Sequence, residues 1–176
     1  ALPIYGNDII LGDNGEIVFL ISGVVESVVM SDVTNGDRDI IAAGDGDNIL
    51  MAGIGNDVID TGVGSDIVFG DAGSAFFTAG ILTDASSIAA IAGNDTINDM
   101  DGDNVILGGA GRDSITSTGG DDIVLGDNGQ ILFSAAGNHP RPAAGGHARP
   151  SPVPQSPLCL RTALRLDRRR GPAARR

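Results

Sequence analysis

The sequence contains no tryptophan and no lysine, only one tyrosine and five phenylalanines, and a single cysteine. A compact core of the usual kind would therefore lack its largest side chains. One cysteine, Cys159, cannot form an intramolecular disulfide, so no disulfide framework is available. No apolar run reaches the roughly 18 residues of a membrane-spanning helix. These absences favour a fold assembled from small repeated units, without a membrane span.

Histidine is missing until His139, so the commonest general base is absent from most of the chain. Neither His-Glu-x-x-His nor Gly-x-Ser-x-Gly occurs, and without lysine a glycine-rich phosphate loop cannot be completed. We therefore expect no enzymatic activity.

Negative charge dominates the first part of the chain. Up to Gly137 there are 22 acidic residues and two arginines, a net charge of −20, whereas residues 138–176 carry nine arginines and one aspartate. A segment this acidic repels itself unless cations neutralise it, and it is a poor candidate for binding nucleic acid. Residues 138–176 also hold seven of the eight prolines, which predicts a disordered Pro/Arg-rich tail.

Glycine, in contrast, is abundant, with 27 residues, and most of it follows a nine-residue frame. Position four of the frame is glycine, with Asp37 as the exception, position six is Asp or Asn, and position eight is apolar. The position-six residues are Asp8, Asp39, Asn48, Asp57, Asp66, Asp95, Asn104, Asp113 and Asp122. The position-eight residues of the two full blocks are Ile41, Leu50, Ile59, Val68, Ile97, Ile106, Ile115 and Val124. A longer period relates the two full blocks, because the frame positions that start at Asp39 recur in the same order from Asp95.

The chemistry of one repeat points to a cation. Calcium prefers about six to eight oxygen ligands from carboxylates and carbonyls, and a Gly-x-Gly turn can aim consecutive carbonyls at one centre. Side chains alternate along a strand, so positions six and eight share a face. Position six then points into the turn and position eight into the core. Position seven is also apolar, as in Ile49 and Ile67, which predicts that part of the outer surface packs against the inserts.

These repeats resemble the haemolysin-type calcium-binding nonapeptide repeats of RTX proteins, Gly-Gly-x-Gly-x-Asp-x-apolar-x. Gly108 to Ile115 fits the pattern best, with all three glycines present. The resemblance implies an all-β fold, a parallel β-roll or β-helix-like solenoid in which two nonads complete one coil, and Ca²⁺ bound between turns on the same edge. It implies four side-chain pairs, Asp39 with Asp57, Asn48 with Asp66, Asp95 with Asp113, and Asn104 with Asp122. It also implies that Asp8 is a metal ligand. The turn glycines implied to supply ligand carbonyls are Gly44, Gly46, Gly53, Gly55, Gly62, Gly64, Gly102, Gly109, Gly111 and Gly120.

The repeats also depart from the family pattern. Asn48 and Asn104 are neutral, which should weaken their sites, unless the preceding Asp47 and Asp103 substitute for them. In the closing nonads position six is Ile17, Ala75 or Ile131, so these turns lack the key ligand. Their Asp13, Asp71 and Asp127 either serve as ligands or only cap the turn. We expect Asp45, Asp60, Asp99 and Asp101 to be solvated surface residues, and Phe19, Phe77 and Phe133 to close the core.

Six segments are predicted. They are the end of a preceding repeat block (1–19), an insert (20–35), a repeat block (36–77), a second insert (78–92), a second block (93–137) and the tail (138–176). In the first insert, residues 24–29 predict an additional strand. Residues 81–91 fit either a strand or a short helix.

The resemblance implies the calcium-binding repeat region of a secreted or cell-surface bacterial-type RTX protein, folding on calcium binding and often exported by a type I system. Its expected partners are calcium ions and neighbouring repeat blocks of a longer parent chain. One alternative is a calcium-independent structural or adhesive solenoid, such as a surface stalk or ice-binding ladder. Another is the non-catalytic repeat region of a secreted hydrolase. A calcium titration followed by circular dichroism separates the first reading from the structural alternative.

Overall fold

A computed structural model describes residues 5–31, 34–88 and 92–134 of the chain. The predicted tail lies outside these residues. All regular structure in the described part is β-strand, and no helix there could cross a membrane. The prediction of an all-β protein is therefore confirmed.

Two parallel sheets carry the nine-residue repeats. The first parallel sheet has the strand order β1 (Ile9–Leu11), β5 (Ile49–Met51), β7 (Ile67–Phe69), β12 (Val105–Leu107) and β15 (Ile123–Leu125). The second has the order β14 (Ser114–Thr116), β11 (Thr96–Asn98), β6 (Val58–Thr61) and β4 (Ile40–Gly44). Two short strands, β10 (Ala92–Gly93) and β13 (Ala110–Gly111), also pair in parallel. Successive nonads alternate between the two sheets, an arrangement consistent with the expected β-roll.

The register of the parallel sheets follows the sequence period. Leu50 pairs with Val68 and Ile41 with Ile59, and each pair is separated by two nonads. Across the second insert the same alignment continues, since Val68 pairs with Ile106. The two blocks therefore stack as one continuous array.

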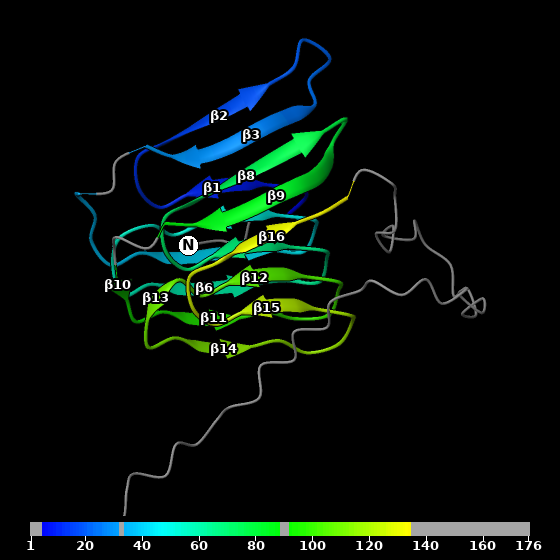
Figure 1. Ribbon diagram of the computed structural model, residues 1–176. Coiled ribbons are helices and arrows are strands. Elements are labelled where there is room, and N and C mark those ends of the chain that lie inside the picture. Colours follow the sequence, from blue (N-terminus) through cyan, green and yellow to red (C-terminus); the bar gives the residue numbers. More distant parts are fainter. Residues whose placement is uncertain (1–4, 32–33, 89–91, 135–176) are drawn as a thin grey trace, which may run out of the picture. The chain divides into compact units, whose positions relative to one another are not determined.

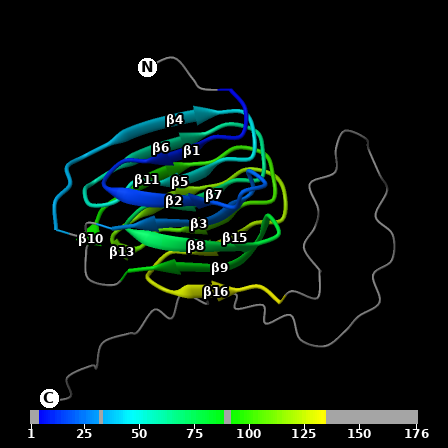
Figure 2. The same ribbon diagram turned by 90° about the horizontal axis from the view of Figure 1, so that it is seen from above.

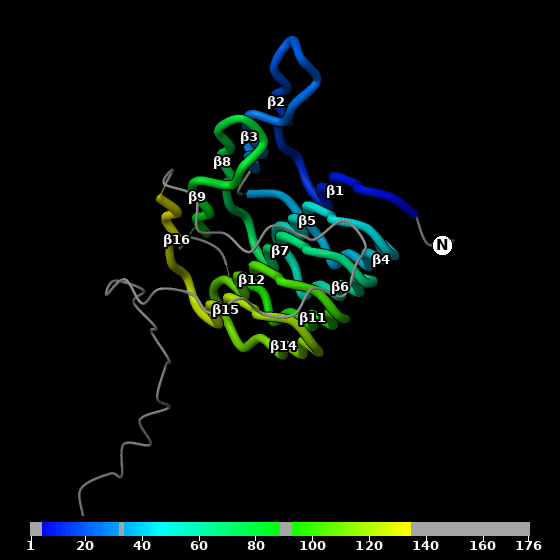
Figure 3. Tube along the Cα trace, turned by 90° about the vertical axis from the view of Figure 1, so that its right-hand side faces the viewer, coloured from blue at the N-terminus to red at the C-terminus, as the bar shows by residue number. Residues whose placement is uncertain are grey.

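A third sheet is antiparallel and lies beside the first parallel sheet (Figures 1 and 3). This hairpin sheet has the order β16 (Gln130–Leu132), β9 (Ile81–Ser87), β8 (Gly73–Thr78), β3 (Val25–Met30) and β2 (Gly15–Phe19). Seen from above, β4 and β6 lie on the side opposite to β9 and β16 (Figure 2). Residues 24–29 were expected to form a strand, and β3 confirms this. Residues 81–87 form a strand rather than a helix.

Both hairpins begin before the expected inserts. β2 lies within residues 1–19 and β8 begins within residues 36–77, which were assigned to repeat blocks, yet they pair antiparallel with β3 and β9. The closing nonads of these blocks have Ile17 or Ala75 at position six instead of aspartate. The departure from the parallel stack thus coincides with the loss of the position-six aspartate.

The turn of the second hairpin is tight. Ala79 and Gly80 link β8 to β9 with φ of 52° and 78°. A two-residue turn with both φ values positive suits the twist of a β-hairpin. Ala79 is the only non-glycine residue with positive φ in the described chain, and its Cβ makes that conformation costly.

Two apolar cores hold the three sheets together. Between the parallel sheets lie the position-eight side chains Leu50, Ile59, Val68, Ile97 and Ile106, which are fully buried. Between the first parallel sheet and the hairpin sheet lie Met51, Phe69 and Leu107, packed against hairpin residues such as Val28 and Leu82. Each of these large buried side chains contributes about 1.5–3 kcal/mol. The second core explains why the roll tolerates apolar residues on its outside.

The predicted packing of position seven against the inserts holds on one sheet only. Ile49 and Ile67 pack into the core below the hairpins, whereas Ile40 on the second parallel sheet is 69% exposed. Phe77 and Phe133 pack against the hairpin core as expected. Phe19 does not close the core, since it is 54% exposed near the end of β2.

Candidate metal centre

The position-six residues form two columns, one along each edge of the parallel stack. The first column contains Asp39, Asp57, Asp95 and Asp113. In each step one carboxylate oxygen accepts the backbone N–H of the position-six residue in the preceding coil. Asp57 Oδ1 accepts from Asp39 N at 2.8 Å, Asp95 Oδ1 from Asp57 N at 2.8 Å, and Asp113 Oδ1 from Asp95 N at 3.0 Å.

The second column repeats this geometry with a mixed composition. Asn48 Oδ1 accepts from Asp8 N, Asp66 Oδ1 from Asn48 N, Asn104 Oδ1 from Asp66 N, and Asp122 Oδ1 from Asn104 N, at distances of 2.8–3.0 Å. Asp57 flanks the second parallel sheet and Asp66 the first, so the two aspartates of neighbouring nonads lie in different columns. All four predicted pairs are brought together.

The structure also links residues that were not paired by the sequence. Asp57 contacts Asp95, Asp66 contacts Asn104, and Asp8 contacts Asn48. These links cross the hairpins, which were expected to separate the blocks. The repeat period did not predict these links. Residues one coil apart are normally separated by two nonads, but here a hairpin is inserted between them and increases the sequence separation.

The second carboxylate oxygen of most column residues is buried and has no hydrogen-bond partner. These atoms are Oδ2 of Asp8, Asp57, Asp66, Asp95 and Asp113. Asp57, Asp66 and Asp95 are each only 1% exposed. A buried carboxylate oxygen without a partner is costly, and a bound cation is one way to compensate it. The residues present therefore fit a hard oxygen-binding ion.

Turn glycines place backbone carbonyls beside the columns. A Cβ at Gly64 would collide with the Gly46 carbonyl, and a Cβ at Gly102 would collide with the Gly64 carbonyl. Gly64 and Gly102 are therefore required because consecutive turns approach this closely. Asp37 is the one position-four residue of the columns that is not glycine. These carbonyls face the position-six side chain, as the hydrogen bond from Asn48 Nδ2 to Gly46 O at 2.9 Å demonstrates.

Carboxylates alone cannot complete a metal shell. Among residues 5–31, 34–88 and 92–134, no three Asp, Glu, His or Cys side chains are grouped closely enough to hold one ion. A cation in either column would therefore be bound by at most two carboxylates, with turn carbonyls supplying the other oxygens. This donor set suits Ca²⁺, which accepts mixed carboxylate and carbonyl ligands.

Burial raises the pKa of several column carboxyl groups. It is the main cause that raises the pKa of Asp66 to about 6 and that of Asp95 to about 7. The neighbouring charges of Asp71, Asp57 and Asp113 raise the pKa of Asp95 further, while the hydrogen bond from Asp57 N opposes them. Burial also raises the pKa of Asp39 and of Asp57. Burial thus disfavours the charged form of these four carboxyl groups when no cation is bound.

The two asparagines occupy their turns differently from aspartate. Asn48 Nδ2 donates to Gly44 O at 3.2 Å and to Gly46 O at 2.9 Å. Asn104 Nδ2 donates to Gly102 O, Asp122 Oδ1 and Asp99 Oδ2. The amide group thereby uses the oxygens that a cation would need. This gives a physical reason for the expectation that asparagine weakens these sites.

Asp99 is not a solvated surface residue, as the sequence led us to expect. It is 4% exposed, and its carboxylate accepts hydrogen bonds from Thr61 Oγ1 at 2.6 Å and Ser117 Oγ at 2.8 Å as well as from Asn104. It holds the first position of its nonad, which is glycine in the family pattern, and this substitution is the sequence signal that was missed. Asp45, Asp60 and Asp101 are exposed as expected.

Asp47 and Asp103 do not replace the neighbouring asparagines in the columns. Asp47 Oδ1 accepts the backbone N–H of Ser65, and Asp103 Oδ1 accepts that of Asp121. Both bonds lie on the exposed side of the turn. Position five faces away from position six, because successive side chains alternate.

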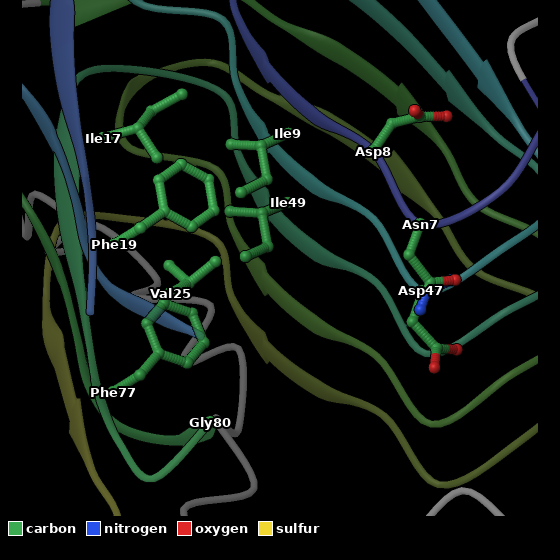
Figure 4. A pocket seen from close by; sticks show the side chains of 10 residues that line it. All are labelled: Asn7, Asp8, Ile9, Ile17, Phe19, Val25, Asp47, Ile49, Phe77 and Gly80. Atoms are coloured by element: carbon green, nitrogen blue, oxygen red, sulfur yellow. The ribbon is translucent and has the colours of Figure 1, made fainter. Parts of the chain in front are cut away.

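A separate cleft of about 550 Å³ opens between β1, β5 and the hairpin sheet. Figure 4 shows Ile9 and Ile49 facing Phe19 and Phe77, with Asp8 and the other polar residues grouped apart. The apolar lining is continuous with the hairpin core. The apolar part of the cleft therefore belongs to the hairpin core, and the cleft meets the second column at Asp8.

Comparison with known proteins identifies the nine-residue repeats as those of a known family. The family model described as the RTX calcium-binding nonapeptide repeat (4 copies) matches residues 33–68, 42–76 and 90–124. No curated protein and no solved structure matches the chain significantly. The matched segments contain the two columns from Asp39 to Asp122. Within these matched segments the chain belongs to the RTX calcium-binding nonapeptide-repeat family, whose repeats suggest a calcium-binding region.

Proposed function

We propose that the nonapeptide repeats within residues 5–134 form a parallel β-roll that folds when Ca²⁺ occupies the turn columns, within a secreted or cell-surface protein. The observation that carries this proposal is the set of buried carboxylate oxygens without partners at Asp8, Asp57, Asp66, Asp95 and Asp113. The position-six side chains and the turn glycine carbonyls would hold the ion.

Electrostatics supports coupling between binding and folding. The segment up to Gly137 has a net charge of −20, and assembling the columns brings aspartates of successive coils together. Cations that bind only the assembled columns stabilise the folded state in proportion to their occupancy. Extracellular calcium modules bind with dissociation constants of about 10⁻⁴–10⁻³ M. Outside a cell, such sites would fill after export.

We also infer that the repeat region is not an enzyme and does not bind nucleic acid. No histidine precedes His139 in the sequence, and the segment up to Gly137 is strongly acidic. Neighbouring repeat blocks of a longer parent chain remain the partners that we propose besides calcium. A parent that is a secreted hydrolase would agree with this inference.

The test is a calcium titration of the full 176-residue chain. Circular dichroism should show a weak β signal in excess chelator at pH 8 and a cooperative gain of β signal at millimolar calcium. Magnesium serves as the control, because it dehydrates reluctantly and demands octahedral geometry. It should induce much less structure at the same concentration. A full β signal in chelator, unchanged by calcium, would refute the proposal.

One observation favours a second candidate, a calcium-independent structural solenoid. The amide of Asn48 satisfies two turn carbonyls, and that of Asn104 satisfies one turn carbonyl and both neighbouring carboxylates. These turns of the second column need no ion. In the titration, a scaffold of this kind would keep its β signal in chelator.

A further inference from the structure

Asp71 is a buried aspartate outside position six, and it stands where the chain leaves the parallel stack for the second hairpin. It follows Gly70 at the end of β7 and is 1% exposed. Its Oδ2 accepts the backbone N–H of Ala110 in the next coil, while its Oδ1 is buried without a hydrogen-bond partner. The Gly93 N–H also faces Asp71 without forming a full hydrogen bond. One oxygen of this side chain is therefore free to bind a ligand.

Asp95 stands where the chain returns from the same hairpin, and its side chain lies beside that of Asp71. A Cβ at Gly93 would lie 2.7 Å from Asp95 Oδ1 and 2.9 Å from Asp71 Oδ1. A Cβ at Gly70 would lie 2.5 Å from Asp95 Oδ2 and would also collide with the Gly108 carbonyl. Two carboxylates and a backbone carbonyl thus surround space that only glycine leaves open.

The first hairpin places two aspartates in the same way, although both are only partly buried. Asp13 follows Gly12 where the chain leaves the stack, and its Oδ2 accepts the backbone N–H of Ile54 at 2.7 Å. Ile54 and Ala110 hold the same position in their turns. A Cβ at Gly12 would lie 2.5 Å from Asp39 Oδ2, and a Cβ at Gly36 would collide with the Asp13 carboxylate. The pair of aspartates at a hairpin root is therefore repeated in both blocks.

Within residues 5–31, 34–88 and 92–134, no buried basic side chain compensates these pairs, because the only two basic residues there, Arg38 and Arg112, are exposed. In the family pattern position two is a glycine, as at Gly53 and Gly109. The hairpin-bearing turns place an aspartate there instead, which adds a carboxylate that the repeat pattern does not require.

We propose that Asp71 with Asp95, and Asp13 with Asp39, form cation sites at the hairpin roots, each of which adds a position-two aspartate to a position-six residue of the first column. A hard divalent cation such as Ca²⁺ bridges the residue that leaves the stack and the residue that returns. The ion thereby fastens the base of each hairpin and couples the docking of the hairpin sheet to calcium. This inference rests on the proposed calcium binding by the turn columns.

The test compares Asp71→Asn with Asp127→Asn in the full chain. Asparagine at 71 keeps an oxygen for the Ala110 N–H but removes the charge. Asp127 also follows a glycine but is exposed, which makes it the matched control. In calorimetric titrations with calcium chloride, Asp71→Asn should bind one ion fewer per chain than the wild type, and Asp127→Asn should bind the same number.

Hydrogen exchange provides a second measurement that reports the hairpin directly. Calcium should slow exchange in β8 and β9 of the wild type, and Asp71→Asn should lose at least about tenfold of that protection. Protection of β5 and β7 should persist. If Asp71→Asn does not fold, Asp13→Asn should show the same loss in β2 and β3.

The outcomes separate this inference from the proposed function. If the wild-type chain binds no calcium, both are overturned. If the wild type binds calcium, but Asp71→Asn keeps its stoichiometry and its hairpin protection, the hairpin-root sites alone are overturned.

Discussion

Acidification of the calcium-free chain should stabilise its fold, which is the opposite of ordinary acid denaturation. Asp95 has its pKa raised to about 7 in the folded chain from an ordinary value of 3.8, chiefly by burial. The folded state therefore binds this proton more tightly than the unfolded state does. The resulting stability is fully present below pH 3.8 and is lost as the pH rises through about 7.

The expected magnitude is a substantial part of a domain's stability. Between pH 8 and pH 5, protonation of Asp95 alone stabilises the folded state by about 3 kcal/mol. Asp66 in the other column, with a pKa of about 6, adds about 1 kcal/mol over the same interval. Protons thus replace part of the charge neutralisation that calcium provides.

Circular dichroism in chelator at pH 8, 7, 6 and 5 measures this effect. The β signal should increase as the pH falls, whereas with millimolar calcium the chain should be folded at pH 8. Calcium affinity should weaken below about pH 7, because protons and calcium compete for Asp95. The variant Asp95→Asn should lose about 3 kcal/mol of the pH dependence. A calcium-free chain that loses structure between pH 8 and pH 5 would refute the reasoning.

Three further predictions concern single residues. Asp57→Ala should raise the calcium concentration at the folding midpoint by at least about tenfold, and Asp60→Ala, at an exposed residue, by less than about twofold. Equal shifts of the midpoint in a calcium titration would contradict the column assignment. Asn48→Asp should lower the calcium concentration at the folding midpoint, because it adds a charged ligand and removes an amide that competes for turn carbonyls; calorimetry showing weaker binding would oppose this. Ala79→Gly should raise the free energy of unfolding in calcium by about 0.5–1 kcal/mol, since it relieves a positive φ of 52°; urea denaturation showing a loss would argue against strain at this turn.

Much of the parallel stack could be predicted from the sequence because its rules are local. A nine-residue frame that places Asp57 at position six and Ile59 at position eight determines which side chain enters the turn and which enters the core. The structure buries both of them. The assignment of neighbouring nonads to different edges follows from the same period.

The hairpin sheet could not be predicted in the same way, because its contacts join residues far apart in the sequence. One signal was nevertheless present at position nine. That position is Met51, Phe69 and Leu107 on the sheet that the hairpins cover, but Asp60 and Asn98 on the uncovered sheet. Position nine thus alternates between apolar and polar residues from one nonad to the next, and the apolar residues mark the sheet that the hairpins cover.

The columns also required more than the repeat pattern. The contact between Asp57 and Asp95 depends on a hairpin folding out of the turn, and sequence separation gives no measure of that. The burial of Asp99 depends on partners contributed by two other coils, Thr61 and Ser117. In each case a neighbour in space decides the role of the residue.

The columns continue across the hairpins without a change in geometry. The step from Asp39 to Asp57 spans 18 residues and that from Asp57 to Asp95 spans 38, yet both end in the same 2.8 Å hydrogen bond. The stack therefore does not constrain the length of chain inserted at a turn. Such an architecture can gain, lose or exchange an inserted hairpin during evolution while its repeats stay aligned. For the same reason, position two of a turn is a suitable place to graft a foreign loop for display.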